Sequence, residues 1–92
     1  MRFMNEYDIE QAKNRYCNNP ILSQAARVLS EYRDIVNSYS DGWGTWTAGT
    51  KPAESLIDIL ERGQATKSDV QKAITRIKSF CTRRNLPKPA SI

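Results

Sequence analysis

The sequence predicts an all-α protein, a compact bundle of three main helices plus a short N-terminal helix. Apolar residues recur at the three- and four-residue spacing of a helix in four separate stretches, and no alternating strand pattern persists. Residues typical of helix starts, Asn19-Pro20 and Thr66, stand before two of these stretches. A chain of 92 residues is enough for one core, so we expect residues 1–92 to form a single helical domain.

The first two helices are expected to begin at Asp8 and at Pro20. Asp8 stands three residues before Gln11, which is close to the spacing of a capping box. Asn19 is a favourable N-cap, and proline suits the first position of a helix. The apolar arc of the second helix, which is expected to reach Ser38, is broad. This breadth predicts a central helix that packs against more than one neighbour.

The third and fourth helices are expected over residues 51–62 and 67–84. Three glycines between residues 40 and 50 predict an irregular loop before the third helix. Gly63 suits the residue that follows the third helix, because glycine adopts the left-handed conformation common there. Two prolines break the chain after the fourth helix. We therefore expect residues 85–92 to form a flexible tail.

The expected core is centred on the middle of each apolar arc, at Leu29, Leu56, Ile74 and Ile77. Cys17 and Cys81 are expected to be buried, unlinked thiols, because small disulfide scaffolds carry more cysteines. The chain shows neither a signal peptide nor an apolar run of membrane-spanning length. The sequence thus predicts a cytoplasmic protein without a membrane partner.

Positive charge is concentrated in the last part of the chain. The formal net charge is +4, and residues 67–92 contain seven basic residues and one acidic residue, a local charge of +6. Such asymmetry indicates a charged partner. The chain has no histidine and only two cysteines, which excludes imidazole catalysis and histidine-ligated metals. We expect no enzyme activity and no cofactor.

Two features form the candidate site for a partner or an anion. Trp43 and Trp46 lie on the glycine-flanked stretch, where one can anchor a partner or stack on a base while the other closes the end of the bundle. On the fourth helix, Lys72, Arg76 and Arg83 fall within about 40° of one another. This stripe suits an acidic partner. It is also what a solvated helix surface with cations near its C-terminal end would show.

Two alternative functions stay open. The join between the third and fourth helices has the pattern of a helix-turn-helix, in which Lys67, Ser68, Gln71 and Lys72 would face a nucleic-acid groove. The other alternative is a protein that sequesters a nucleotide signal, with a tryptophan stacked on the base and the basic side chains holding phosphate.

A resemblance to known proteins rests on residues 32–38 and 40–46. The second of these segments reads Ser-Asp-Gly-Trp-Gly-Thr-Trp and precedes an amphipathic helix. Over about residues 28–62, the chain resembles small phage- or prophage-encoded helical accessory proteins of unassigned role. Many short phage proteins block host defence enzymes, sequester nucleotide signals or regulate transcription. The resemblance implies a non-catalytic inhibitor or adaptor that docks on a host protein or protein–nucleic-acid complex, for example a defence or transcription component. It transfers no catalytic residues.

Overall fold

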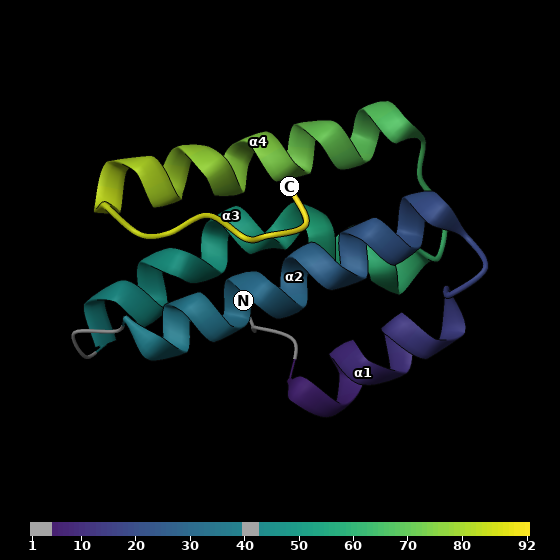
Figure 1. The fold of residues 1–92 in the computed structure, drawn as a ribbon, viewed down its shortest axis with the longest axis horizontal. Coiled ribbons are helices and arrows are strands. Elements are labelled where there is room, and N and C mark those ends of the chain that lie inside the picture. Colours follow the sequence, from purple (N-terminus) through teal and green to yellow (C-terminus); the bar gives the residue numbers. More distant parts are fainter. Residues whose placement is uncertain (1–4, 40–42) are drawn as a thin grey trace.

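Four helices make up the computed structural model, which describes residues 5–39 and 43–92, and only the backbone of residues 43–48. They are α1 (Glu6–Arg15), α2 (Pro20–Ser38), α3 (Trp43–Arg62) and α4 (Lys67–Arg84) (Figure 1). No strand occurs within these described ranges. The expected all-α bundle of three main helices and a short N-terminal one is therefore confirmed.

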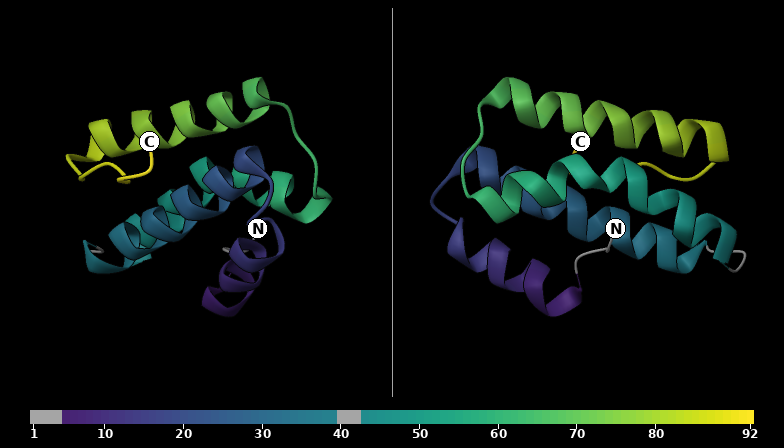
Figure 2. Two further views of the ribbon diagram at one scale, coloured as in Figure 1. Left: turned by 45° about the vertical axis from the view of Figure 1, so that its right-hand side comes forward. Right: turned by 180° about the vertical axis from the view of Figure 1, so that it is seen from behind.

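α2 is the central helix of the bundle, as its broad apolar arc predicts. It packs against α1, α3 and α4, and α3 also packs against α4. The views in Figure 1 and Figure 2 agree that α3 and α4 run side by side in opposite directions. Among the described helices, none combines the length and the apolar character needed to cross a bilayer.

The helix ends follow local capping patterns, with one correction. The Asn19 side chain accepts hydrogen bonds from the first turn of α2, with Pro20 at its start, and Thr66 begins α4 with a complete capping box, all as predicted. Gly63 (φ 75°) follows α3, again as predicted. The expected start of the first helix at Asp8 is wrong. Asn5 caps α1 instead, because its side-chain oxygen accepts the Asp8 N–H at 2.8 Å.

α3 begins eight residues before the predicted position. Residues 43–50, expected as an irregular loop, are helical, and Pro52 lies inside the helix; residues 40–42 lie outside the described ranges. The physical reason is visible at Gly49, whose carbonyl accepts a 2.8 Å hydrogen bond from the buried Tyr32 hydroxyl. A Cβ at position 49 would lie 3.1 Å from that hydroxyl and 3.2 Å from Val36 Cγ2. The glycine therefore permits a close approach of α2 and α3 and does not mark a loop.

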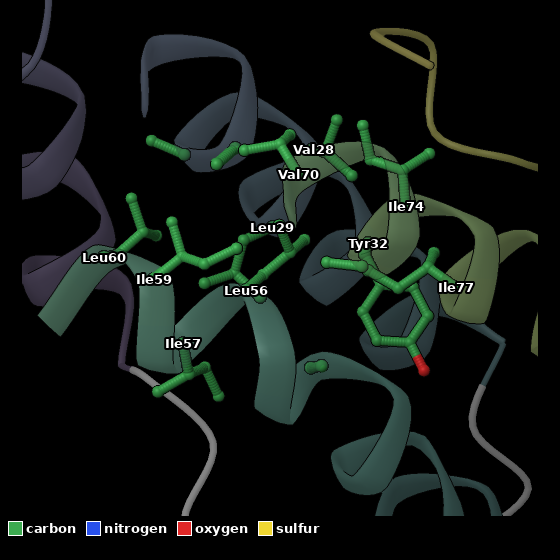
Figure 3. Close-up of a cluster of buried hydrophobic side chains, with 14 of the residues drawn as sticks. Val28, Leu29, Tyr32, Leu56, Ile57, Ile59, Leu60, Val70, Ile74 and Ile77 are labelled. Carbon is green, nitrogen blue, oxygen red and sulfur yellow. The ribbon is translucent and has the colours of Figure 1, made fainter. Parts of the chain in front are cut away.

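The core lies between α2, α3 and α4, where their apolar side chains point toward one another (Figure 3). The four residues predicted at its centre are buried: Leu29, Leu56, Ile74 and Ile77. Tyr32 and Phe80 meet edge to face with ring centroids 6.2 Å apart. The guanidinium carbon of Arg84 lies 5.5 Å from the centre of the Phe80 ring, so a cation covers this edge of the core.

Residues 86–92, which we call the strap, turn back from the end of α4 and lie along α2 and α4 (Figure 1). Asn85 ends α4 in the left-handed conformation with φ 56°, and this reverses the chain. Leu86 packs against the core and Pro89 is buried. The segment expected as a flexible tail is thus docked on the bundle in the structure.

Candidate interaction face

The three cations predicted on one stripe of α4 are exposed: Lys72, Arg76 and Arg83. The helix that carries them begins at a capping box. The Thr66 hydroxyl accepts the Asp69 N–H at 3.1 Å, and the Asp69 carboxylate accepts the Thr66 N–H at 3.0 Å. Because the opposite side of α4 is apolar and buried, the cations are held at the surface.

Arg76 connects α4 to α3. Its guanidinium donates to the Ser55 hydroxyl at 2.6 Å and to the Lys51 carbonyl at 3.4 Å. On α3, residues Lys51, Ser55 and Arg62 fall within about 40° of one another. Since Ser55 contacts α4, this stripe of α3 borders the basic stripe of α4.

The two stripes also meet near the start of α4. The hydrogen bond from the Thr66 N–H lowers the pKa of the Asp69 carboxyl most, the Thr66 hydroxyl adds to this effect, and the cations Arg62 and Lys72 contribute further. Arg62 on α3 and Lys72 on α4 therefore act on one carboxylate. We call the set Lys51, Arg62, Lys72, Arg76 and Arg83 the α3–α4 basic face.

Sequence reasoning found the α4 half of this face and missed Lys51 and Arg62. Periodicity within one helix assigns residues to a stripe of that helix, but it does not say which stripes of two helices adjoin. The available signal was the short connection between the helices, since short turns favour antiparallel neighbours. The short connection, combined with the angular positions of Lys51 and Arg62 around α3, would have placed these two residues beside α4.

Trp43 and Trp46, the predicted aromatic anchors, lie in the first turn of α3, and their side chains are outside what the structure describes. Their backbone is helical, so the expected loop is not the element that carries them. Because α3 and α4 are antiparallel, the start of α3 and the end of α4 lie at the same end of the bundle (Figure 2). Arg83 is therefore at that end as well. An anchoring or base-stacking role for either tryptophan stays a prediction.

The residues proposed to face a nucleic-acid groove are all exposed on the first turns of α4: Lys67, Ser68, Gln71 and Lys72. A helix-turn-helix crosses its two helices at about 90–120°. Here α3 and α4 instead run alongside each other as an antiparallel hairpin (Figure 1). This side-by-side, antiparallel packing differs from the crossed helix pair of a helix-turn-helix.

The two cysteines are unlinked, as predicted, but they differ in burial. Cys81 is buried, whereas Cys17 is exposed, so its predicted burial is wrong. The reason is that α1 already ends at Arg15, which leaves Cys17 in the turn before α2. Burial raises the pKa of the Cys81 thiol, and the nearby Lys88 cation opposes this rise. Among the described residues, no three His, Cys, Asp or Glu side chains come together as a metal site.

Comparisons with known proteins do not extend these observations. The resemblance to phage-encoded helical proteins rests on the residues quoted above and stays a prediction. Models of known protein families, curated proteins and solved structures gave no significant match to this chain.

Proposed function

We propose that this protein is a non-catalytic inhibitor or adaptor that docks on an acidic surface of a partner protein through the α3–α4 basic face. The observation that carries the proposal is the bridge from Arg76 to Ser55 and to the Lys51 carbonyl. The bridge holds the Arg76 guanidinium against α3, beside the backbone of Lys51. A surface ordered before binding loses less conformational entropy in the complex, and this favours affinity.

The charge pattern around the face favours a protein over a nucleic acid. Glu54, Asp58 and Glu61 lie along the outer side of α3, close to Lys51 and Arg62 in the helical register. A phosphate backbone laid across both helices would meet these carboxylates, which repel it. A protein surface can offer both signs of charge in matching places, and such complementarity sets the register of docking.

The size and helical packing of the chain suit a role that works by covering another surface. The proposed target is a host protein, alone or in a complex with nucleic acid, of the kind that defence or transcription components provide. An inhibitor would block a surface of that target, whereas an adaptor would link it to a second protein. The function rests on docking in both cases, so one set of variants tests both.

The experiment compares two charge reversals of equal size. The test variant is Lys72→Glu with Arg83→Glu, which leaves the Arg76 bridge intact. The matched control is Arg27→Glu with Lys78→Glu, two exposed cations outside the face. Each purified protein is used to capture partners from an extract of the cells that produce it, with and without nuclease treatment, at low and at high salt, after circular dichroism has shown native helix content.

We expect the test variant to lose partner capture at low salt, where the wild-type protein and the control keep it. The difference should shrink at high salt. Added salt shortens the screening length below the about 10 Å that it has at 0.1 M, and this weakens the attraction between exposed charges. Normal capture by the test variant would contradict the proposal. Capture that depends on intact nucleic acid, together with binding to duplex DNA that falls steeply with salt, would instead support the nucleic-acid alternative.

A further inference from the structure

The strap packs over the seam between α2 and α4, on contacts that involve no residue of the basic face. We propose that the strap is a reversible latch, that Glu31 on α2 holds it closed, and that its release exposes the thiol of Cys81. This inference does not depend on the proposed function. It concerns a second region of the molecule and has its own readout.

The polar contacts of the strap converge on one residue. The Glu31 carboxylate accepts the Ser91 N–H at 2.8 Å with one oxygen and the Ser91 hydroxyl at 2.7 Å with the other. The Gln24 side chain donates to the Ser91 carbonyl at 3.3 Å. Every polar group of Ser91 is thus paired with α2, across 60 to 67 positions of sequence. Hydrogen bonds to a charged acceptor are stronger than those between neutral groups, so Glu31 makes the main polar contact that holds the strap on α2.

The remainder of the strap has few hydrogen bonds. Its two prolines have no N–H to donate. The Leu86 N–H bonds to the Cys81 carbonyl at 2.8 Å, which ends α4, and the Ile92 N–H bonds back to Pro89 within the strap itself. Apart from the apolar contacts of Leu86 and Pro89, the Glu31 and Gln24 contacts hold the strap. A segment attached in this way opens at a lower free energy than the whole bundle unfolds.

Cys81 lies at the end of α4 from which the strap turns back, and its carbonyl accepts the Leu86 N–H at 2.8 Å. It is fully buried, with an exposed fraction of 0%. It belongs to the same core cluster as Tyr32 of α2, and Leu86 of the strap packs against that cluster. Lys88 of the strap also acts on the thiol electrostatically. Cys81 therefore adjoins both the core side chains of α2 and the strap. Opening the strap removes its cover while the core contacts of α4 remain.

The test measures the rate at which a neutral alkylating reagent, iodoacetamide, modifies each cysteine of the native full-length chain. Peptide mass spectrometry separates the two sites. Cys17 is exposed and serves as the internal reference. The variants are Glu31→Gln and Ser91→Ala, and the matched control is Asp34→Asn, which removes an exposed carboxylate from the same helix. Because the reagent is neutral, the negative charge that Glu31→Gln or Asp34→Asn removes does not change how the reagent approaches the protein.

We expect Cys81 in the wild-type protein and in Asp34→Asn to react far more slowly than Cys17. In Glu31→Gln the Cys81 rate should rise about tenfold, because the side chain loses its charge and one of the two oxygens that accept from Ser91. Ser91→Ala should give a smaller rise, since it removes one of the two bonds to Glu31. The Cys17 rate should be the same in all four proteins.

Low concentrations of urea distinguish the latch from global unfolding. Opening of the strap exposes little surface, so the Cys81 rate should be nearly independent of urea well below the unfolding transition. Unchanged Cys81 rates in both natively folded variants would overturn the proposal, as would a Cys81 rate that follows global unfolding. If Glu31→Gln does not fold, Ser91→Ala decides the question, because it removes only one half-buried hydroxyl and leaves the charge on α2 in place.

Discussion

Gly49 is a residue at which α2 and α3 approach closely, and it gives a direct test of their packing. We expect Gly49→Ala to lower the free energy of unfolding by about 1 kcal/mol. Overpacking destabilises the folded state by about 1–3 kcal/mol, and the higher helix propensity of alanine offsets about 1 kcal/mol of this. The two groups that a new methyl meets, the Tyr32 hydroxyl and Val36, are buried and do not move aside easily. Urea unfolding measures the change. Ser79→Ala, at an exposed position of α4, is the control and should be neutral or slightly stabilising; a stabilised Gly49→Ala would contradict the close approach.

Tyr32 makes the stability of the bundle depend on pH in the alkaline range. Burial, and to a smaller extent Cys81, raises the pKa of Tyr32 above its ordinary value of 10.0, while Arg84 lowers it. The folded protein therefore holds this proton more tightly than the unfolded chain does. The resulting stabilisation is complete below pH 10.0 and is lost as the pH rises above that value.

The matched variant for this effect is Tyr32→Phe. At neutral pH it should be less stable than the wild-type protein by about 1 kcal/mol, because the bond to the Gly49 carbonyl is lost. At about pH 11 the difference should narrow, because ionisation of this tyrosine stabilises the unfolded wild-type chain and so lowers the wild-type free energy of unfolding, whereas phenylalanine does not ionise. Urea unfolding at both pH values measures it. If the difference in free energy of unfolding between the two proteins is the same at both pH values, Tyr32 has the same pKa in the folded and unfolded states.

At the scale of the helices, the capping box of α4 has a measurable effect. Thr66→Ala should lower the free energy of unfolding by about 1 kcal/mol. Thr75→Ala is a matched control, because it removes the same group from an exposed position on the same helix, where the hydroxyl bonds only to the Gln71 carbonyl. Thermal unfolding should show a lower midpoint for Thr66→Ala alone. Equal midpoints for the two variants would argue against the capping box.

The same box predicts an effect of acid. The hydrogen bonds from Thr66 hold the pKa of Asp69 below its ordinary value of 3.8. Asp69 therefore contributes stability above pH 3.8, and this contribution is lost as the pH falls from there through the lower, folded-state pKa. Asp69→Asn should be less stable than the wild-type protein at neutral pH and approach it in acid. A difference that persists below both pKa values would contradict the assignment.

Helix existence and most helix ends were predictable from the sequence because their causes are local. Thr66 with Asp69, and Asn19 with Pro20, are neighbours in the chain, and their patterns predict the same caps that the structure shows. The start of α3 was not predictable in this way. Gly49 has the residue type of a loop, but its role is set by Tyr32, 17 positions away in the sequence. A local pattern does not contain that contact.

The candidate site was half predictable for the same reason. The stripe of Lys72, Arg76 and Arg83 follows from the period of one helix, whereas its continuation onto Lys51 and Arg62 depends on how two helices pack. The Arg76 bridge spans 21 and 25 positions. Sequence periodicity gives the faces of each helix, and only the tertiary arrangement joins them.

At the scale of the whole molecule, the core accounts for most of the stability of so small a chain. Ile77 is fully buried between the three main helices (Figure 3). Ile77→Ala should lower the free energy of unfolding by about 2–5 kcal/mol, against a total of about 5 kcal/mol for a marginal domain. Calorimetry should show a large drop in the melting temperature or no folded state. An unchanged melting curve would contradict the packing, and Lys78→Ala at the next, exposed position should change it little.

The order of contacts along the chain has a consequence for the speed of folding. α1 with α2, α2 with α3 and α3 with α4 are each neighbours in sequence and in space, and such local contacts are typical of domains that fold within microseconds to milliseconds. The contacts of Ser91 with Glu31 and Gln24 span 60 to 67 positions, so we expect them to form after the transition state. Glu31→Gln should then accelerate unfolding and leave the refolding rate unchanged in stopped-flow experiments. The last segment of the chain would set how long the folded state lasts, while the helical hairpins before it set how quickly that state is reached.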